Sequence, residues 1–290
     1  MNIAILSRGE TLYSTRSLLN ACEARDHTVE VLDPTYCNLT VTNGKAKLYF
    51  ENELADNLDA IIPRIGASNT FYGTNVVRHF EAMGIFSVVS SAGILNSRDK
   101  WICFQILAKN RIPVPKTIFA SFFEFEEQLK TFNGKPIIIK LLEGTHGEGV
   151  ILTESPQNAL ATIEALNAAG VKFLLQEFIE ESKGADVRAI VVDGVVVVAM
   201  KRQCKVGDFR SNLHRGGTSK IIELSSAEEK IAINAAKALG LGFCGVDILQ
   251  SKNGPLVLEI NSTPGLEGIE NTSGKSVSKS VIEYIERIMK

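Results

Sequence analysis

The sequence lacks a long hydrophobic run, paired cysteines and an excess of either charge. Its 290 residues contain no apolar run of the roughly 18 residues that a membrane-spanning helix needs. Five scattered cysteines with no C-x-x-C pair argue against a disulfide framework or a zinc site and favour a cytoplasmic location. Lys and Arg number 31 against 33 Asp and Glu, whereas nucleic-acid binders usually carry a basic excess. We therefore expect neither a membrane nor a direct nucleic-acid partner.

Two common nucleotide-binding patterns are also absent. No G-x-G-x-x-G follows the first predicted strand, Ile3–Leu6, so a nicotinamide oxidoreductase lacks its main local support. The glycine-rich segment Glu143–Gly149 is not a Walker A loop, since no Gly-Lys-Ser/Thr follows it. Its three glycines still allow a tight turn that points N–H groups at an anion, and Lys140 could place a positive charge on the same phosphates. A plain glycine-rich hairpin turn is the alternative interpretation.

Strand and helix patterns alternate in the first third of the chain. Strands are predicted at Ile3–Leu6, Val29–Leu32 and Ala60–Pro63, and helices over residues 13–25 and 71–83. Such β-α-β alternation predicts an α/β domain with a mostly parallel sheet, ending near residue 95.

The rest of the chain has an α+β pattern of antiparallel strand pairs and covering helices. A helix capped by Ser97 is predicted to run to Lys109, and a capping box of Ser226 and Glu229 opens another. The dipeptide Asp193-Gly194 predicts a hairpin turn. The other predicted strands are Ile137–Lys140, Val150–Leu152, Phe173–Glu177, Phe243–Leu249 and Pro255–Asn261, with a helix over residues 159–169.

Three oxygen-bearing side chains lie in the last predicted hairpin. Glu259 and Asn261 are two residues apart in one strand, so they share a face. If the turn has three residues, Lys252-Asn253-Gly254, then Asp247 falls opposite Glu259. Two carboxylates and an amide oxygen, without His or Cys, favour a hard cation such as Mg²⁺. The alternative is a solvated outer face of the sheet.

Potential cations are concentrated between residues 201 and 215. They are interleaved with Phe209, Ser211 and Asn212, and this composition favours contact with an anion such as phosphate over a solvated surface loop, which is the alternative. Asp186 and Arg188 lead into the same region, either for function or as a local ion pair. The six potential cations are Lys201, Arg202, Lys205, Arg210, His214 and Arg215.

Together, and in this order, these features resemble the ATP-grasp superfamily and, more closely, the RimK-type α-L-glutamate ligases. The resemblance extends over essentially the whole chain, and its most specific stretch is Gly207–Gly217. It implies an ATP-grasp fold behind an N-terminal pre-ATP-grasp domain, with segments 1–95, 96–180 and 181–290. The other matching stretches are Ile3–Arg8, Pro63–Gly66, Phe71–Thr74, Ser97–Lys100, Gly245–Asp247 and Glu259–Glu270.

The resemblance also implies roles for individual residues. Asp247 and Glu259 would bind one Mg²⁺ or Mn²⁺, and Glu259 and Asn261 a second. Arg202 and Arg210 would act on the transferring phosphate as catalytic residues. The remaining implied contacts are with ATP: Lys140 on the phosphates, Glu177 and Phe178 at the adenine, and Asp186, Arg210, Ser211 and Asn212 on the nucleotide.

The implied activity is ATP-dependent addition of L-glutamate to the C-terminal glutamate of a small-subunit ribosomal protein, through an acylphosphate. The implied state is a homo-oligomer, a tetramer by resemblance. A sister ligase that joins an amino acid to a carrier protein or a small carboxylate is the alternative, and a non-catalytic nucleotide-binding module is a second. We expect replacement of Asp247 or Glu259 by alanine to abolish ligation while leaving the fold.

Overall fold

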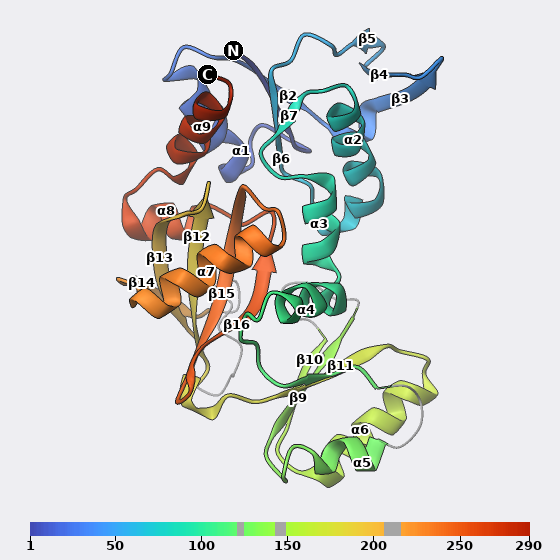
Figure 1. The fold of residues 1–290 in the computed structure, drawn as a ribbon, viewed down its shortest axis with the longest axis vertical. Coiled ribbons are helices and arrows are strands. Elements are labelled where there is room, and N and C mark those ends of the chain that lie inside the picture. The colour runs from blue at the N-terminus through green and yellow to red at the C-terminus, as the bar shows by residue number, and fades with distance from the viewer. Residues whose placement is uncertain (121–124, 143–148, 206–215) are drawn as a thin grey trace.

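The computed structural model describes residues 1–120, 125–142, 149–205 and 216–290. Its N-terminal layer is a parallel sheet in the order β2-β1-β6-β7, with helix α1 (Tyr13–Glu23) and helix α2 (Thr70–Ala82) packed against it (Figure 1). The predicted α/β alternation is confirmed. The sheet forms because residues 3–6 and 60–63 are apolar and fully buried, as strands covered on both faces require. Its strands are β1 (Asn2–Leu6), β2 (Thr28–Leu32), β6 (Ala60–Pro63) and β7 (Phe86–Ser87).

A second sheet, which the sequence analysis did not predict, projects from this layer (Figure 1). It comprises β3 (Cys37–Thr42), β4 (Lys45–Phe50) and β5 (Glu53–Leu54). Asn43 and Gly44 turn the chain with φ angles of 51° and 72°, the left-handed geometry of a tight hairpin. Helix α2 supports this sheet, since the Tyr72 hydroxyl donates to the Cys37 carbonyl at 2.6 Å. Short 3₁₀ turns flank the two sheets at η1 (Pro34–Tyr36) and η2 (Ala67–Asn69).

Two helices, rather than the one predicted, lead out of the N-terminal layer. They are α3 (Ser91–Arg98) and α4 (Lys100–Lys109). The prediction of Ser97 as a cap is wrong: Ser97 is buried inside α3 and donates to the Ile94 carbonyl. Asp99 caps α4, because its carboxylate accepts the N–H groups of Trp101 and Ile102 at 2.9 Å each.

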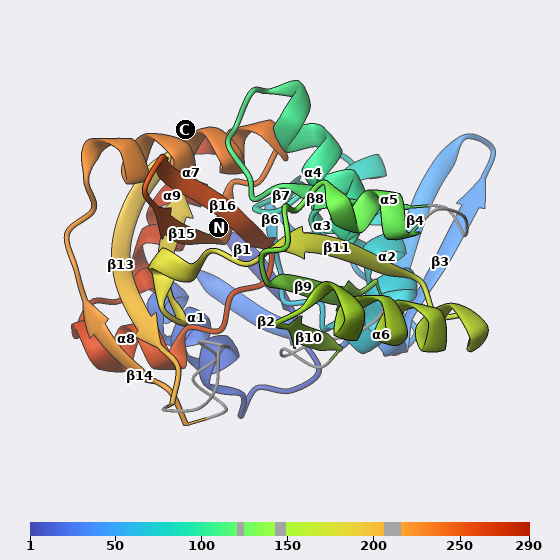
Figure 2. The same cartoon turned by 90° about the horizontal axis from the view of Figure 1, so that it is seen from below.

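The central part of the chain folds around its own small core. Its antiparallel sheet has the order β10-β9-β11-β8 and is covered by α5 and α6 (Figures 1 and 2). Leu129, Ile139, Ile163 and Leu175 belong to a buried cluster separate from the main one. The elements are β8 (Thr117–Ile118), α5 (Phe125–Lys130), β9 (Ile137–Leu141), β10 (Val150–Thr153), α6 (Pro156–Ala168) and β11 (Phe173–Glu177), followed by η3 (Glu180–Ser182).

The C-terminal part is a five-stranded antiparallel sheet in the order β14-β13-β12-β15-β16. The hairpin at Asp193-Gly194 is confirmed, with φ angles of 47° and 71°. The predicted capping box lies one residue earlier, at Ser225 and Glu228, because the Ser225 hydroxyl accepts the Glu228 N–H. The elements are β12 (Ala185–Val192), β13 (Val195–Gln203), β14 (Thr218–Ile221), α7 (Ser226–Ala238), β15 (Phe243–Ser251), β16 (Gly254–Asn261), α8 (Glu267–Ser273) and α9 (Val277–Ile288).

Helix α7 covers one face of this sheet, and Asp247 lies on the opposite face. Gln250 of β15 donates to Glu228 of α7 at 2.7 Å, so the even-numbered side chains of β15 point toward the helix. Successive strand residues alternate between faces, so Asp247 points to the opposite side.

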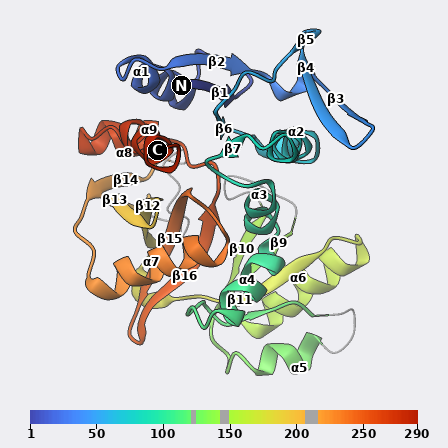
Figure 3. The ribbon, with the colours of Figure 1, turned by 45° about the horizontal axis from the view of Figure 1, so that its top comes forward.

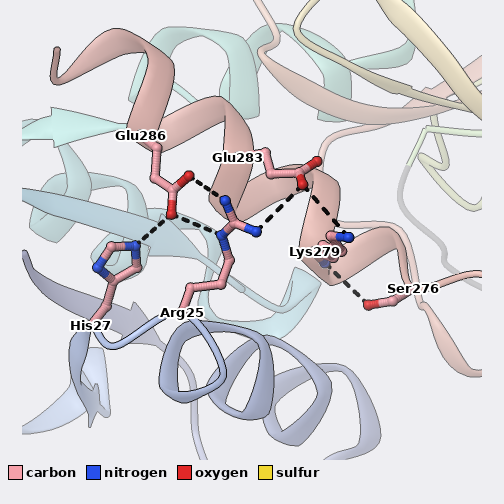
Figure 4. A network of polar contacts seen from close by, with 6 residues as sticks. All are labelled: Arg25, His27, Ser276, Lys279, Glu283 and Glu286. Carbon is pink, nitrogen blue, oxygen red and sulfur yellow. Dashed lines mark hydrogen bonds and ion pairs between the residues drawn. The ribbon is translucent and has the colours of Figure 1, made fainter.

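The last two helices return to the N-terminal layer. Figure 3 shows α8 and α9 between α1 and the C-terminal sheet. Figure 4 shows the polar network that joins α9 to the end of α1, where Arg25 donates to Glu286 and the His27 Nε2 lies 2.9 Å from the same carboxylate. The main hydrophobic core accordingly runs without a break from the N-terminal strands into α9. The division at residues 95 and 180 stays a prediction. Among the described residues, no helix is long and apolar enough to cross a membrane.

The network in Figure 4 predicts an acid-dependent loss of stability. The hydrogen bond from Arg25, with help from His27, lowers the pKa of Glu286 from its ordinary 4.5 to about 2. A carboxylate with a lowered pKa stabilises the fold above pH 4.5, and this contribution is lost as the pH falls toward 2. We expect Glu286→Gln to lower the melting temperature at pH 7 and the difference from wild type to fade below pH 4.5. Glu283→Gln is the control, because Glu283 lies 3.4 Å from Arg25 and is more exposed; an equal effect in both variants would contradict the prediction.

Candidate active site

Asp247 and Glu259 face each other across β15 and β16, in the register that the sequence predicted. The turn itself differs from the prediction. Ser251 pairs with Gly254, so the turn has two residues rather than three. The extra residue is Leu258, since Ile248 pairs with Val257 while Asp247 pairs with Glu259. A β-bulge therefore restores the offset that a longer turn would have supplied.

Asp247 is buried between two arginines. Arg188, its direct partner on β12, donates from Nε to Oδ1 and from Nη2 to Oδ2, both at 2.7 Å. Arg202 donates from Nη2 to Oδ2 at 2.8 Å. Burial alone would raise the pKa of this carboxyl, but the two guanidinium groups outweigh it and lower the pKa to about 2. Asp247 is therefore a carboxylate across the physiological pH range.

Arg202 connects two buried carboxylates. It is 3% exposed, lies opposite Asp186 in the pairing of β13 with β12, and donates to Asp186 from Nε at 2.7 Å and from Nη2. Burial opposes its charge, yet the carboxylates of Asp247 and Asp186 raise the pKa of the guanidinium. The sequence left open whether Asp186 and Arg188 serve a function or form a local ion pair. In the structure each pairs with a residue on a neighbouring strand, Asp186 with Arg202 on β13 and Arg188 with Asp247 on β15.

Two lysines approach this face from outside the sheet. Lys140, on β9 of the central sheet, is close enough for the charges of Glu259 and Asp247 to act on it. Burial, with a smaller contribution from nearby Lys100, lowers the pKa of Lys140 to about 8, although the carboxylates of Glu259 and Asp247 oppose the shift. Lys100, at the start of α4, donates to the Leu142 carbonyl at 2.9 Å, and burial lowers its pKa as well.

The donor set suits a divalent hard cation. Glu259 is exposed, and Asn261 is half-buried with its Oδ1 accepting the Thr263 N–H at 2.8 Å. Asp247 Oδ1 accepts one hydrogen bond and Oδ2 two, so Oδ1 keeps an acceptor site for a metal ion. Within the described ranges, no three His, Cys, Asp or Glu side chains gather as a metal site. The amide oxygen of Asn261, two residues after Glu259 on β16, is the third oxygen donor of the predicted set.

The remaining predicted residues lie at the edges of this face or outside the described residues. The Glu177 N–H donates to the Lys116 carbonyl at 2.9 Å, and the Phe178 N–H donates to the Pro136 carbonyl at 3.3 Å. Residues 143–148, 206–209 and 213–215 and the predicted ATP contacts Arg210, Ser211 and Asn212 lie outside the described residues.

Arg188 and Lys100 lie in this site although the sequence did not predict them there. Arg188 was weighed only against Asp186, its neighbour in sequence. The signal for its real partner is the pairing of β12 with β15, which joins residues 59 positions apart. Lys100 is in a stretch that supported the resemblance, but no local pattern placed it near Glu259.

The sequence matches two protein-family models over nearly its whole length. Residues 97–285 match the RimK-like ATP-grasp domain, and residues 1–94 match the RimK pre-ATP-grasp domain. A probable alpha-L-glutamate ligase of Vibrio atlanticus (strain LGP32) is 52% identical, with 99% of this chain and 96% of the relative covered. The corresponding relative from Halorhodospira halophila (strain DSM 244 / SL1) is 48% identical, with 99% and 95% covered.

Solved structures of ATP-grasp enzymes share the fold. The ligase PsnB, in a complex with a phosphomimetic variant of its minimal precursor, Mg and ADP, has a TM-score of 0.77 at 20% identity, covering 100% of this chain and 98% of PsnB. D-cycloserine synthetase DcsG has a TM-score of 0.73 at 18% identity, with both chains fully covered. The ATP-grasp fold implies the use of ATP and a divalent metal, which matches the oxygen donors and cations on this face. The chain belongs to the RimK-like ATP-grasp family and is an ATP-dependent carboxylate–amine ligase.

Proposed function

We propose that this enzyme adds L-glutamate to the C-terminal glutamate of a small-subunit ribosomal protein. The observation that supports phosphoryl transfer at this face is the pairing of Asp247 with Glu259, with Lys140 facing them from the central sheet. The choice of glutamate rests on relatives that are about half identical over nearly the whole chain and are named probable alpha-L-glutamate ligases. The choice of acceptor rests on the stretch Gly207–Gly217.

The proposed reaction has two steps. A carboxylate oxygen of the acceptor attacks the γ-phosphorus of ATP, the bond between the γ-phosphorus and the bridging oxygen breaks, and ADP leaves. The amine of glutamate then attacks the acyl carbon, phosphate leaves, and the nitrogen loses a proton as the amide forms. The first step depends on alignment and charge neutralisation. Lys140, Arg202 and Arg210 would supply the cations, each contributing about 2–4 kcal/mol to the transition state.

The oxygen donors define where divalent ions would be held. Asp247 and Glu259 would hold one Mg²⁺ or Mn²⁺, and Glu259 and Asn261 a second. Bound there, the ions would neutralise the negative charge that builds up on the phosphates. Arg188 and Arg202 keep the Asp247 carboxylate ionised and oriented before any metal binds.

The nucleotide contacts complete the proposal. Glu177 and Phe178 would line the adenine pocket, and Asp186, Ser211 and Asn212 would reach the nucleotide. The segment Gly144–Gly149 would close over the phosphates, which protects an acylphosphate from water. We also propose a homo-oligomer, a tetramer by resemblance.

Intact-mass analysis tests the proposed function. The enzyme is incubated with ATP, Mg²⁺, L-glutamate and a panel of acceptors that contains small-subunit ribosomal proteins, a carrier protein and small carboxylic acids. Mass steps of one glutamyl unit on a ribosomal protein, with matching ADP release, are the expected result. Steps on another acceptor alone would identify a sister ligase, and ATP binding without acceptor-dependent ADP release would indicate a non-catalytic module.

Lys140 predicts a pH dependence of nucleotide affinity. Because its pKa is lowered to about 8, the side chain is partly neutral near that pH, whereas a bound triphosphate favours the cation. ATP binding should therefore take up about half a proton at pH 8 and up to about one proton well above it, where affinity should fall up to about tenfold per pH unit. Calorimetry at pH 8 in two buffers of different ionisation enthalpy measures the uptake. In Lys140→Arg the charge is permanent, so the same uptake in that variant would assign it to another group.

A further inference from the structure

Three arginines meet at the carboxyl edge of the N-terminal sheet. Arg8 follows β1 and Arg64 follows β6, and these two strands are neighbouring and parallel, with Leu6 paired to Pro63. Arg98 ends α3 beside them, since its guanidinium donates to the carbonyls of Ile65 and Gly66. Within the described part of the chain, none of the three arginines has a carboxylate ion-pair partner. Ligands of open parallel sheets bind outside this edge.

Arg64 has a buried guanidinium nitrogen without a hydrogen-bond partner among the described residues. Its Nη2 donates to the Pro264 carbonyl at 2.8 Å, while its Nη1 is buried and has no hydrogen-bond partner among the described residues. Burial lowers the pKa of Arg64 to about 10, and the charge of Glu270 opposes this. The Glu270 carboxylate already has another partner, because its Oε1 accepts the Val277 N–H at 2.8 Å at the start of α9. A buried polar group without a partner is costly, which points to a role in binding.

Arg98 and Thr263 hold the turn after Arg64 in place. Arg98 donates to the Gly66 carbonyl at 3.2 Å and to the Thr70 hydroxyl at 2.6 Å, and the Thr263 hydroxyl donates to the Ile65 carbonyl at 3.2 Å. Arg8 lies over the same turn, since a Cβ added at Gly66 would be 4.0 Å from its Nη2. Arg8 therefore lies beside the turn that begins at Arg64, at the same edge of the sheet.

This arginine group adjoins the candidate active site. The loop that accepts from Arg64 directly follows Asn261, and a Cβ added at Gly245 would lie 3.2 Å from Pro264 and 3.7 Å from the Nε of Arg188. Gly245 pairs with Asn261 and lies two residues before Asp247 on the same face of β15. Pro264 therefore lies between Arg64, which donates to its carbonyl, and Gly245 of the strand that carries Asp247.

We propose that Arg8 and Arg64 bind a substrate carboxylate that does not react, and that Arg98 acts as a positioning residue for the turn that carries them. The inference rests on the proposed function, in which free glutamate and an acidic acceptor tail bring several carboxylates to one site. Arg188 is already paired with Asp247, and Arg202, which contacts Asp186 and Asp247, is assigned above to the transferring phosphate, so neither is assigned these contacts. A guanidinium fork matches a carboxylate in geometry and charge. The carboxylate belongs either to free glutamate or to the acceptor tail.

Calorimetric titration of the ADP-bound, Mg²⁺-loaded enzyme with L-glutamate and with tetraglutamate tests the inference and separates the two sources. The variants are Arg8→Gln, whose side chain is exposed and has no hydrogen-bond or ion-pair partner among the described residues, and Arg64→Lys, which keeps the charge but not the fork. Each should weaken one of the two ligands about 10-fold, as the loss of a charge-assisted hydrogen bond does, and leave ADP affinity unchanged. Arg78→Gln, an exposed arginine on α2, is the control and should change nothing.

Weakened glutamate binding assigns the site to the free amino acid, and weakened tetraglutamate binding assigns it to the acceptor tail. Folded Arg8→Gln with wild-type affinity for both ligands would overturn the inference, whatever happens to Arg64→Lys. So would wild-type enzyme that binds neither ligand. If wild type binds an acidic ligand through these arginines but forms no glutamyl product with any acceptor, the proposed function fails and the inference stands.

Discussion

Glu259→Gln is expected to lower the ligation rate by at least about 100-fold and to leave the free energy of unfolding unchanged. The glutamine removes one negative charge from the proposed metal site, and loss of a single preorganised transition-state contact costs about this much. Stability should stay near wild type because the Glu259 side chain is exposed and the described residues give it no hydrogen bond or ion pair. Steady-state ADP release with the acceptor that intact-mass analysis identifies measures the rate, and urea unfolding measures the stability.

Asp247→Ala is expected to lose both activity and stability. Its carboxylate is buried between two guanidinium groups, so alanine leaves Arg188 without its carboxylate partner and removes one of the two carboxylates that the buried Arg202 contacts. Breaking a buried ion pair from one side costs about 3–5 kcal/mol. The structure thus revises the expectation that the alanine variant would leave the fold intact. Asp247→Asn keeps the shape and one acceptor oxygen, and should lose less stability than alanine while losing as much activity. Wild-type turnover in either Glu259→Gln or Asp247→Asn would remove the metal assignment.

Arg202→Met is expected to destabilise the enzyme by about 3–5 kcal/mol at pH 7, because the carboxylates of Asp186 and Asp247 stay buried with one cation fewer. Urea unfolding gives the value. Lys201→Met is the matched control from the same strand: Lys201 points to the other face, donates to Gln250 in an exposed contact, and should cost no more than about 0.5 kcal/mol. Equal losses in both variants would contradict the importance of the buried network.

The loss in Arg202→Met should also depend on pH. In the wild type, the pKa of Asp247 is lowered from 3.8 to about 2, so its stabilising contribution is present above pH 3.8 and is lost as the pH falls toward 2. Without Arg202 one of the two lowering charges is gone, and the pKa of Asp247 rises. The variant then loses less than the wild type on acidification, and the difference between them should shrink as the pH falls from 3.8 toward 2.

Local patterns predicted most of the fold and the register of the two facing carboxylates. Three of the four strands of the N-terminal sheet, the hairpin at Asp193-Gly194 and the position of Asp247 opposite Glu259 were predicted correctly, whereas the short strand β7 was missed. The reason given for that position was partly wrong, because the offset comes from Leu258 and not from the turn. A turn and a bulge shift the register by the same single residue, and spacing alone does not distinguish them.

Contacts between distant segments were beyond local patterns. The pairing of Arg188 with Asp247 depends on which strand lies next to β12, and no periodicity encodes that. Helix caps failed by one or two residues, at Asp99 instead of Ser97 and at Ser225 instead of Ser226, because neighbouring residues were equally good caps. The projecting sheet was missed although Asn43-Gly44 is a strong hairpin signal that was present in the sequence.

The bulge at Leu258 divides the last hairpin into two parts with different tolerance for evolutionary change. On its strand-end side, adding or deleting one residue would rotate Glu259 and Asn261 to the opposite face and dismantle the site. On its tip side, the ladder from Ile248 to the turn at Lys252-Asn253 carries none of the proposed ligands. Matched residue pairs could be gained or lost there while the parity of the donor strand is kept. The tip of this hairpin is therefore where homologous chains can differ in length, and where a reporter peptide could be grafted, without moving the proposed metal ligands.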